Sequence, residues 1–364
     1  MNHRKFYRFA GALVCTLVLC LSAASQSQTP DDPNNKVFKI NVHEVIVPVS
    51  VKEANGGLVP NLEQEDFTIF EDKRKQTIIQ FSSDPEPLSV VVLVDTEMAG
   101  ETLRTLSKYW GVLSKNFTAE DEVSAYRFDH FVTKLGDFSN SPLAIEKSFA
   151  PVTEIAANHP KEADIPDTPL GGKLPGWLSD ALRTPAPNPT ADPTDPSKVD
   201  RPPQPGLVTK LLHDAIFTAA NDLRNRAPGH RKVVIVLTDG RVTGGNIHSV
   251  AETRNLLLKE GADQIQVYGI GVDVTQPVFK RPFSILDSYS APSGGDVYFA
   301  TSGADIVDTF GHIVDQARSE YVMSYVSNNT PPKRLETYRS IDVKTTDPRL
   351  KVTHRSGYFQ LPQP

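Results

Sequence analysis

The sequence predicts an α/β fold: a doubly wound, mostly parallel sheet inserted in a small antiparallel β-domain that the N- and C-terminal segments build together. Continuous apolar runs at 89–94 and 232–237 are typical of strands covered on both faces, and 265–272 is a further expected strand. Apolar residues at helical spacing lie between these runs, which is the alternation expected of a parallel sheet. Strand-like segments gather instead at the two ends of the chain, so we expect both ends to contribute to one β-domain.

The first residues of the 364-residue chain have the pattern of an export signal. Three basic residues precede an apolar run of about a dozen residues, and small side chains follow at 22–24. We expect a signal peptide over 1–25 and a polar leader over 26–36, and therefore an exported protein, periplasmic or extracellular. The run is short for the roughly 20 residues of a spanning helix, so no transmembrane segment is expected after cleavage.

The composition excludes several classes of partner and chemistry. The chain carries a formal charge of -6, and loss of a signal with three basic and no acidic residues leaves about -9. A nucleic-acid partner is not expected, because phosphate binding needs a clustered basic surface. Both cysteines, Cys15 and Cys20, lie in the signal, so the mature chain has no thiol, disulfide or cysteine metal site.

The β-domain is expected in two parts, over 37–85 and over 321–364. Alternating apolar residues, many of them β-branched, predict its strands. These expected strands are 37–51, 67–70, 78–81, 321–326, 338–344 and 350–358.

The α/β part is expected over 86–320. Its expected strands are 89–94, 122–128, 131–135, 232–237, 265–272 and 297–300, and its expected helices are 100–117, 207–223, 247–260 and 304–319. A Pro-rich segment over 151–205 interrupts it. With 13 prolines, this segment predicts an exposed, flexible insertion, in which Trp177 is a local apolar anchor.

Two of the apolar runs end in an aspartate. Asp95 follows the first, and Asp239 follows the second in the sequence Thr-Asp-Gly. In open α/β sheets ligands bind beyond the carboxyl ends of the strands. Two carboxylates delivered there predict a site for a hard divalent cation such as Mg²⁺, which prefers oxygen ligands.

At these residues the sequence resembles the von Willebrand factor type A (VWA) domain, and in particular the bacterial VWFA-related domain family described from acidobacteria. The flanking segments VHEVIVPVSV, LEQEDFTIFEDKRKQTIIQF and KVTHRSGYF also carry the resemblance, which covers nearly all of the mature chain except the insertion. The family has a metal-ion-dependent adhesion site, formed by an Asp-x-Ser-x-Ser loop, a threonine and a later aspartate. The resemblance implies a secreted protein-binding or adhesion module that uses the rim of its sheet.

Residue by residue, the resemblance assigns the degenerate metal site to Asp95, Glu97, Thr209 and Asp239. Glu97 and Ala99 stand where the family has two serines. In the family the threonine precedes the following helix in the pattern Thr-x-Leu-x-Asp-Ala. Thr209 is one residue farther from the Asp-Ala pair than this pattern requires, and Lys210 stands at the position that the pattern gives to the threonine.

Two outcomes stay open for this site. A divalent cation binds the four residues, or the Lys210 ammonium points inward and replaces the cation, which gives a salt-bridged pseudo-site without metal. Thr96 and Thr238 are interpreted as hydroxyls that cap the backbone.

Two other functions remain as alternatives to the binding module. One is a non-catalytic scaffold of the cell envelope. The other is a Mg²⁺-dependent phosphatase similar to haloacid dehalogenases, because Asp95-Thr96-Glu97 follows a buried strand. The lysine and downstream acidic pair of those enzymes are not found, and the motifs of serine, cysteine and zinc hydrolases are missing too, so no enzymatic activity is expected.

Overall fold

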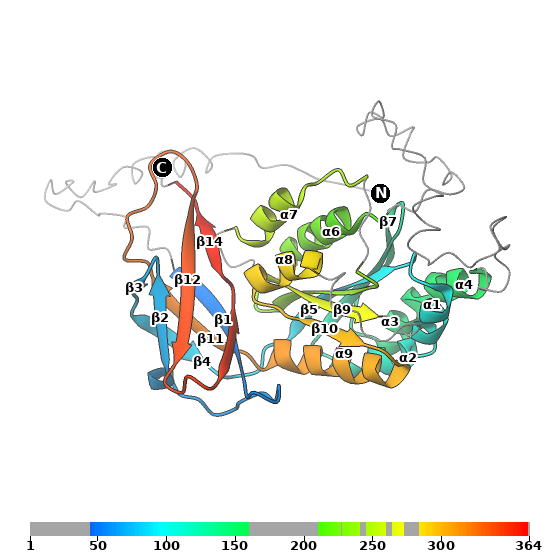
Figure 1. The fold of residues 1–364 in the computed structure, drawn as a ribbon, viewed down its shortest axis with the longest axis horizontal. Coiled ribbons are helices and arrows are strands. Elements are labelled where there is room, and N and C mark those ends of the chain that lie inside the picture. Colours follow the sequence, from blue (N-terminus) through cyan, green and yellow to red (C-terminus); the bar gives the residue numbers. More distant parts are fainter. Residues whose placement is uncertain are drawn as a thin grey trace, which may run out of the picture. The chain divides into compact units, whose positions relative to one another are not determined.

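A six-stranded sheet positions the residues of the predicted site (Figure 1). The computed structural model describes residues 44–159, 210–226, 228–240, 245–259, 264–272 and 284–362. The predicted signal and leader, Thr209, Trp177 and the insertion from residue 160 onward lie outside the described residues.

The sheet has the strand order β10-β9-β8-β5-β6-β7, in which β7 alone runs antiparallel to its neighbour. Every residue of β5, β8 and β9 is buried, as the apolar runs predict. The strands are β5 (Leu88–Asp95), β6 (Glu122–Phe128), β7 (Val132–Ser139), β8 (Arg231–Thr238), β9 (Ile265–Val272) and β10 (Val297–Ala300). The predicted doubly wound, mostly parallel sheet is confirmed.

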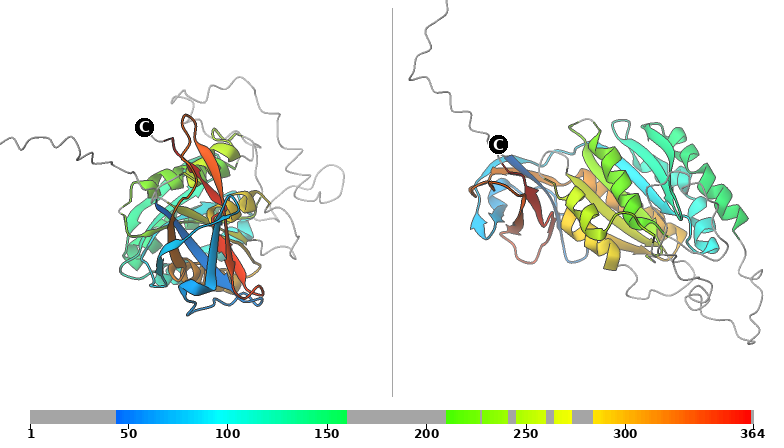
Figure 2. Two further views of the ribbon diagram at one scale, coloured as in Figure 1. Left: turned by 90° about the vertical axis from the view of Figure 1, so that its left-hand side faces the viewer. Right: turned by 90° about the horizontal axis from the view of Figure 1, so that it is seen from above.

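Helices cover both faces of this sheet (Figures 1 and 2). One face packs against α1 (Gly100–Ser107), α2 (Trp110–Leu113), α3 (Pro142–Ser148), α4 (Ala150–Asn158) and α9 (Gly303–Arg318). The other packs against α6 (Leu212–Arg224), α7 (Val250–Leu257) and α8 (Ser284–Ser293). Short 3₁₀ turns occur at Gln64–Asp66 and Ser114–Asn116.

Two four-stranded sheets form a β-sandwich from both ends of the described chain, as predicted. Their orders are β13-β1-β11-β4 and β14-β12-β2-β3, and all pairings are antiparallel. The sandwich strands are β1 (Glu44–Lys52), β2 (Phe67–Glu71), β3 (Arg74–Lys75), β4 (Ile78–Ser82), β11 (Tyr321–Val326), β12 (Thr337–Thr345), β13 (Lys351–His354) and β14 (Gly357–Gln360). Alternate residues of β1 and β11 fill its core.

Three expected segments differ from the structure. The helix expected over 100–117 is broken after Ser107 into α1, α2 and a 3₁₀ turn. The strand expected over 350–358 is divided, because Arg355 turns inward and its guanidinium donates to the carbonyls of Leu258 and Gly357.

The third difference concerns the start of the insertion predicted over 151–205. Residues 150–158 form α4 instead of a flexible segment. Pro151 is tolerated because it lies in the first helical turn, where no backbone N–H donor is required. Val152 and Ala156 bury their side chains against the sheet, which the proline count alone could not reveal.

A buried carboxylate joins the sandwich to the α/β part at the point where the chain passes from α9 to β11. Glu320 is fully buried and accepts hydrogen bonds from Ser50 Oγ of β1 at 2.8 Å and from Gln266 Nε2 at 2.9 Å. Its other oxygen lies 3.1 Å from Arg231 Nη1 at the start of β8. Burial raises the pKa of Glu320, and the Arg231 charge opposes that rise.

We expect Glu320→Gln to destabilise the protein by about 3–5 kcal/mol, because it leaves the buried guanidinium of Arg231 with one carboxylate fewer. Glu86→Gln is the matched control, since Glu86 also pairs with Arg231, at 3.3 Å, but is 41% exposed. Glu86→Gln should lower the free energy of unfolding by less than about 1 kcal/mol. Urea unfolding of both variants measures the difference, and equal losses would contradict the assignment of Glu320 as the main partner.

Candidate functional site

The two predicted aspartates lie at one edge of the six-stranded sheet. β5 and β8 are parallel neighbours with Val94 opposite Leu237, so both strands end at the same edge, here called the rim. Asp95 is the last residue of β5, and Asp239 directly follows β8. The topology of the sheet therefore brings the two carboxylates together.

The Lys210 ammonium lies between these carboxylates. Its Nζ is 3.0 Å from Asp95 Oδ2 and 2.7 Å from Asp239 Oδ1. Exposure of the side chains is 1% for Lys210, 0% for Asp95 and 11% for Asp239. Lys210 points inward, as the second of the two open outcomes requires.

Both oxygens of Asp95 are engaged. The backbone N–H of Glu97 donates to Oδ1 at 3.0 Å, while Thr238 Oγ1 donates to Oδ2 at 2.6 Å beside the ammonium. The Thr238 hydroxyl also accepts from the N–H of Gly240 at 3.1 Å. The interpretation of Thr238 as a backbone cap is therefore incomplete, because its proton goes to the central carboxylate.

The charges of the three groups follow from burial and proximity. Burial raises the pKa of Asp95 to about 6, with Lys210 lowering it and Asp239 raising it further. Burial lowers the pKa of Lys210, but the two carboxylates outweigh this effect, and its pKa is raised. Lys210 is therefore a cation at neutral pH and supplies the charge that the acidic pair needs.

Glu97 does not join this group. Its Oε1 lies 3.4 Å from His130 Nδ1, and its side chain is 30% exposed. Burial raises the pKa of the Glu97 carboxyl, against the influence of His130. Ala99 precedes the first turn of α1 and offers no ligand atom. Of the four assigned residues, the structure joins Asp95 and Asp239 through Lys210, pairs Glu97 with His130, and does not describe Thr209.

These residues do not fit a divalent cation. Lys210 Nζ occupies the place between the two carboxylates that a bridging ion needs, and its positive charge there repels one. Within the part of the chain that the structure describes, no group of three or more His, Cys, Asp or Glu side chains could hold a metal ion.

One contributor to the rim had no signal in the sequence. Asn246 Oδ1 accepts from the N–H groups of His213 at 2.8 Å and Asp214 at 3.2 Å, in the first turn of α6. Its Nδ2 donates to the Lys210 carbonyl at 3.4 Å. Asn246 thus holds the backbone that carries the lysine, but 36 residues separate the two and no local pattern connects them.

Asp129 organises the turn between β6 and β7. Its Oδ1 accepts from the N–H of Phe131 at 2.9 Å in the turn between β6 and β7. Its Oδ2 accepts from Thr96 Oγ1 at 2.7 Å, so Thr96 ties this turn to the end of β5 instead of capping its own backbone.

Comparison with known proteins gives structural neighbours that include VWA domains. The manganese-loaded TRAP protein of Plasmodium vivax is 12% identical with a TM-score of 0.38, and the match covers 80% of this chain and 99% of that one. A von Willebrand factor type A protein from Catenulispora acidiphila is 10% identical with a TM-score of 0.38, covering 89% and 74%. Proximal thread matrix protein 1 from the mussel byssus is 14% identical with a TM-score of 0.37; the match covers 65% of this chain and about half, 49%, of that one. No family model and no curated protein matches the sequence.

We expect Lys210→Met to destabilise the protein by about 3–5 kcal/mol, because it leaves two buried or nearly buried carboxylates facing each other without a cation. The double variant Lys210→Met/Asp95→Asn also removes the charge of Asp95. Its free energy of unfolding should be at least about 1 kcal/mol higher than that of Lys210→Met alone. Urea unfolding of the wild type, of the single variants Lys210→Met and Asp95→Asn, and of the double variant completes the double-mutant cycle. Additive losses would mean that the lysine and the aspartate do not interact.

Stability should also depend on pH through Asp95. The pKa of Asp95 is about 6 in the folded state and 3.8 in the unfolded state, so the folded state binds this proton more tightly. The contribution of Asp95 to the free energy of unfolding therefore declines as the pH rises from 4 to 6. Asp95→Asn should therefore gain about 2 kcal/mol relative to the wild type between pH 4 and pH 7. Unfolding curves of both proteins at four pH values test this, and parallel pH profiles would rule it out.

Proposed function

We propose that the protein is an exported, non-enzymatic binding module of the VWA type whose rim engages a protein ligand without a divalent cation. The observation that carries this proposal is the Lys210 ammonium between Asp95 and Asp239. It supplies within the chain the positive charge that the resembling family takes from a metal ion. The rim is then complete before any ligand arrives.

The geometry argues against the phosphatase alternative. A nucleophilic aspartate must reach the substrate with a free carboxylate oxygen. Asp95 is fully buried, with Oδ1 bound to a backbone N–H and Oδ2 bound to Thr238 and Lys210. No oxygen of Asp95 is left for attack on a phosphate, which supports a binding role.

The same geometry changes which ligands suit the rim. In the resembling family an acidic side chain of the partner completes the cation's shell. Here the ammonium is 1% exposed and already contacts two carboxylates, so it offers nothing to such a group. The half-buried Glu97 is the carboxylate that the rim presents to solvent, so contacts with the partner should involve hydrogen bonds and basic groups instead.

Export and adhesion belong to the same proposal. Export rests on the expected signal at 1–25, which lies outside the described residues, and adhesion rests on the resemblance to the VWA family. In the part of the chain that the structure describes, none of the helices has the length and apolar character needed to cross a membrane. A scaffold role in the cell envelope remains the alternative, since it too needs only a non-catalytic surface.

Binding of the mature protein to an immobilised envelope extract of the producing cells tests the proposal. We expect binding to be equal in EDTA and in Mg²⁺, and Glu97→Lys to weaken it at least about tenfold by reversing the charge of the rim. Asp137→Lys is the matched control, because it makes the same change of charge at a 92% exposed position on β7.

Two results would count against this function. Binding that disappears in EDTA would mean that the rim needs a divalent cation to engage its ligand. Binding that Glu97→Lys leaves unchanged would move the interface away from the rim and favour the scaffold alternative.

A further inference from the structure

One end of the sandwich brings together two segments that are far apart in the sequence. These are the turn between β2 and β3 and the loop between β11 and β12 (Figure 1). Arg339 on β12 joins them, because its Nη1 lies 3.0 Å from Asp72 Oδ2 in the turn and its Nη2 donates to the Thr330 carbonyl of the loop at 2.7 Å. The Asn328 N–H also donates to Gln76 Oε1, directly after β3, at 3.2 Å. The two segments therefore form one surface, here called the tip.

The tip carries an excess of positive charge. Its exposed basic side chains are Lys73, Arg74, Lys75, Lys333 and Arg334. Among the described residues, none of these five forms an ion pair. Two exposed carboxylates lie at the same end, Glu336 in the loop and Glu44, which pairs with Val326, while Asp72 is already paired with Arg339. The tip is therefore cationic on a chain whose formal charge is -6, and it attracts an anionic partner.

Apolar side chains are exposed beside these cations. Leu335 in the loop is 80% exposed, and Tyr338 on β12 is 41% exposed. Leu361, which is 43% exposed, directly follows β14, whose last residue pairs with Thr337 at the start of β12. Single exposed apolar residues are ordinary on a protein surface, but three at one end of a sheet, next to five basic residues, mark an interaction surface.

This combination suits the surface of an anionic lipid bilayer. Basic side chains are attracted to headgroup phosphates, and leucine and tyrosine enter the boundary between headgroups and acyl chains. A protein partner would need a recess shaped to receive Leu335, which protrudes from the loop. A bilayer takes up such a side chain without a preformed recess, so the high exposure of Leu335 favours a lipid surface over an acidic protein.

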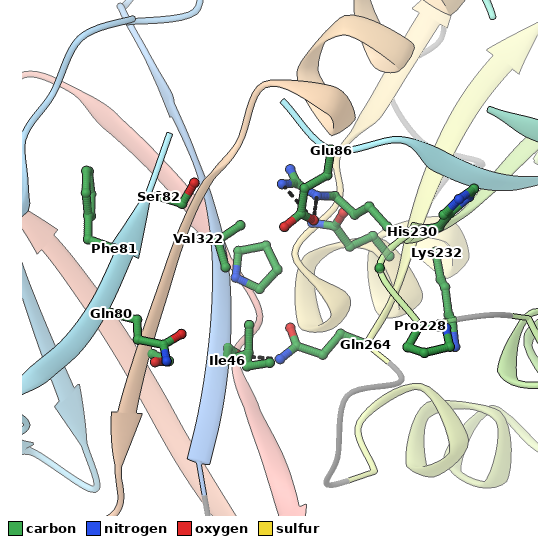
Figure 3. A pocket seen from close by; sticks show the side chains of 15 residues that line it. Ile46, Gln80, Phe81, Ser82, Glu86, Pro228, His230, Lys232, Gln264 and Val322 are labelled. Atoms are coloured by element: carbon green, nitrogen blue, oxygen red, sulfur yellow. Dashed lines mark hydrogen bonds and ion pairs between the residues drawn. The ribbon is translucent and has the colours of Figure 1, made fainter. Parts of the chain in front are cut away.

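The tip differs from the face of the sandwich that adjoins the α/β part. Figure 3 shows Ile46 and Val322 of the sandwich opposite Gln264 and Pro228, and the Gln264 side chain donates to the Ile46 carbonyl. That face is therefore covered by the rest of the chain. The rim lies at the other ends of β5 and β8 and is not part of the tip.

We propose that the tip is a peripheral docking site for an anionic phospholipid bilayer. Lys73–Lys75 and Lys333–Arg334 contact the headgroup phosphates, and Leu335 enters the apolar boundary below them. Five cations and one leucine give reversible binding that salt weakens, because exposed charges are screened. This inference does not rest on the function proposed for the rim.

Cosedimentation of the full mature chain with lipid vesicles tests the docking. We expect binding to phosphatidylcholine vesicles that contain about 30% phosphatidylglycerol, and binding at least about tenfold weaker to phosphatidylcholine alone or in about 0.5 M NaCl. Lys333→Glu/Arg334→Glu should weaken binding at least about tenfold. Lys108→Glu/Lys115→Glu is the matched control, because it makes the same change of charge at two exposed positions of the α/β part and should leave binding unchanged.

A second pair of variants tests the apolar contact. Leu335→Ser should weaken binding to the anionic vesicles roughly fivefold, since it removes the side chain that enters the boundary. Leu143→Ser is its matched control, at a 59% exposed position on α3, and should have no effect. All of these positions are exposed, so thermal unfolding should show that each variant is as stable as the wild type.

Three results would overturn the proposal. One is no binding of the wild type to the anionic vesicles, or equal binding to both kinds of vesicle. Another is that Lys333→Glu/Arg334→Glu behaves like its control. The third is binding that depends on charge but is unaltered in Leu335→Ser, which would assign the tip to an acidic soluble partner instead. Glu97→Lys at the rim should change vesicle binding by less than about twofold, so the two proposals fail separately.

Discussion

The rim depends on one electrostatic constraint, the neutralisation of two carboxylates that neighbouring parallel strands deliver to the same place. Asp95 has no exposed surface, and removing an ionised carboxylate from water is costly unless a counter-charge lies close by. Lys210 provides that counter-charge from the segment just before α6, 115 residues along the chain from Asp95. The segment before α6 must therefore lie beside the ends of β5 and β8, where Lys210 contacts Asp95 and Asp239. Asn246 holds this segment in place through the Lys210 carbonyl.

A second buried ion pair organises the opposite end of the sheet. Glu320 and Arg231 join the last helix, the start of β8 and the sandwich strand β1. Lys52 adds a further contact, 2.6 Å from Asp296 just before β10. The ion pairs at the two ends of the sheet thus hold different parts of the chain. The pair at the rim holds loops, and the pair at the other end holds the strands of the sandwich.

The sequence was most informative where periodicity and topology act together. Apolar runs such as 89–94 predict buried parallel strands, and parallel strands bring their terminal residues to one edge, so the Asp95–Asp239 pair could be predicted without coordinates. Whether Thr209 or Lys210 faces the site could not, because a shift of one residue in an irregular turn decides which side chain points inward. The helix α8 was missed because Pro292 and several small polar residues weaken its pattern.

Buried polar atoms without a hydrogen-bond partner, among them Gln266 Oε1 and Ser324 Oγ, could not be predicted from the sequence for a different reason. Gln266 and Ser324 occupy ordinary alternating positions of two strands, and only the packing of one sheet on another brings them together. A glutamine in a strand has no recognisable pattern that distinguishes an unsatisfied acceptor from a satisfied one. Such sites come from tertiary contacts between segments distant in the sequence.

The pairing of β1 with β11 joins the first strand of the described chain to one that follows the α/β part, with Ser50 and Glu320 in contact across 270 residues. Such a sheet cannot form until the residues of β11 have been synthesised. The α/β part has shorter-range connections, and its own ends already meet, since the Glu86 N–H donates to the Arg318 carbonyl at 3.3 Å. Once this part has folded, the entropy of closing the long loop between β1 and β11 is largely removed. Connectivity therefore favours an order of folding in which the inserted part forms before the sandwich closes.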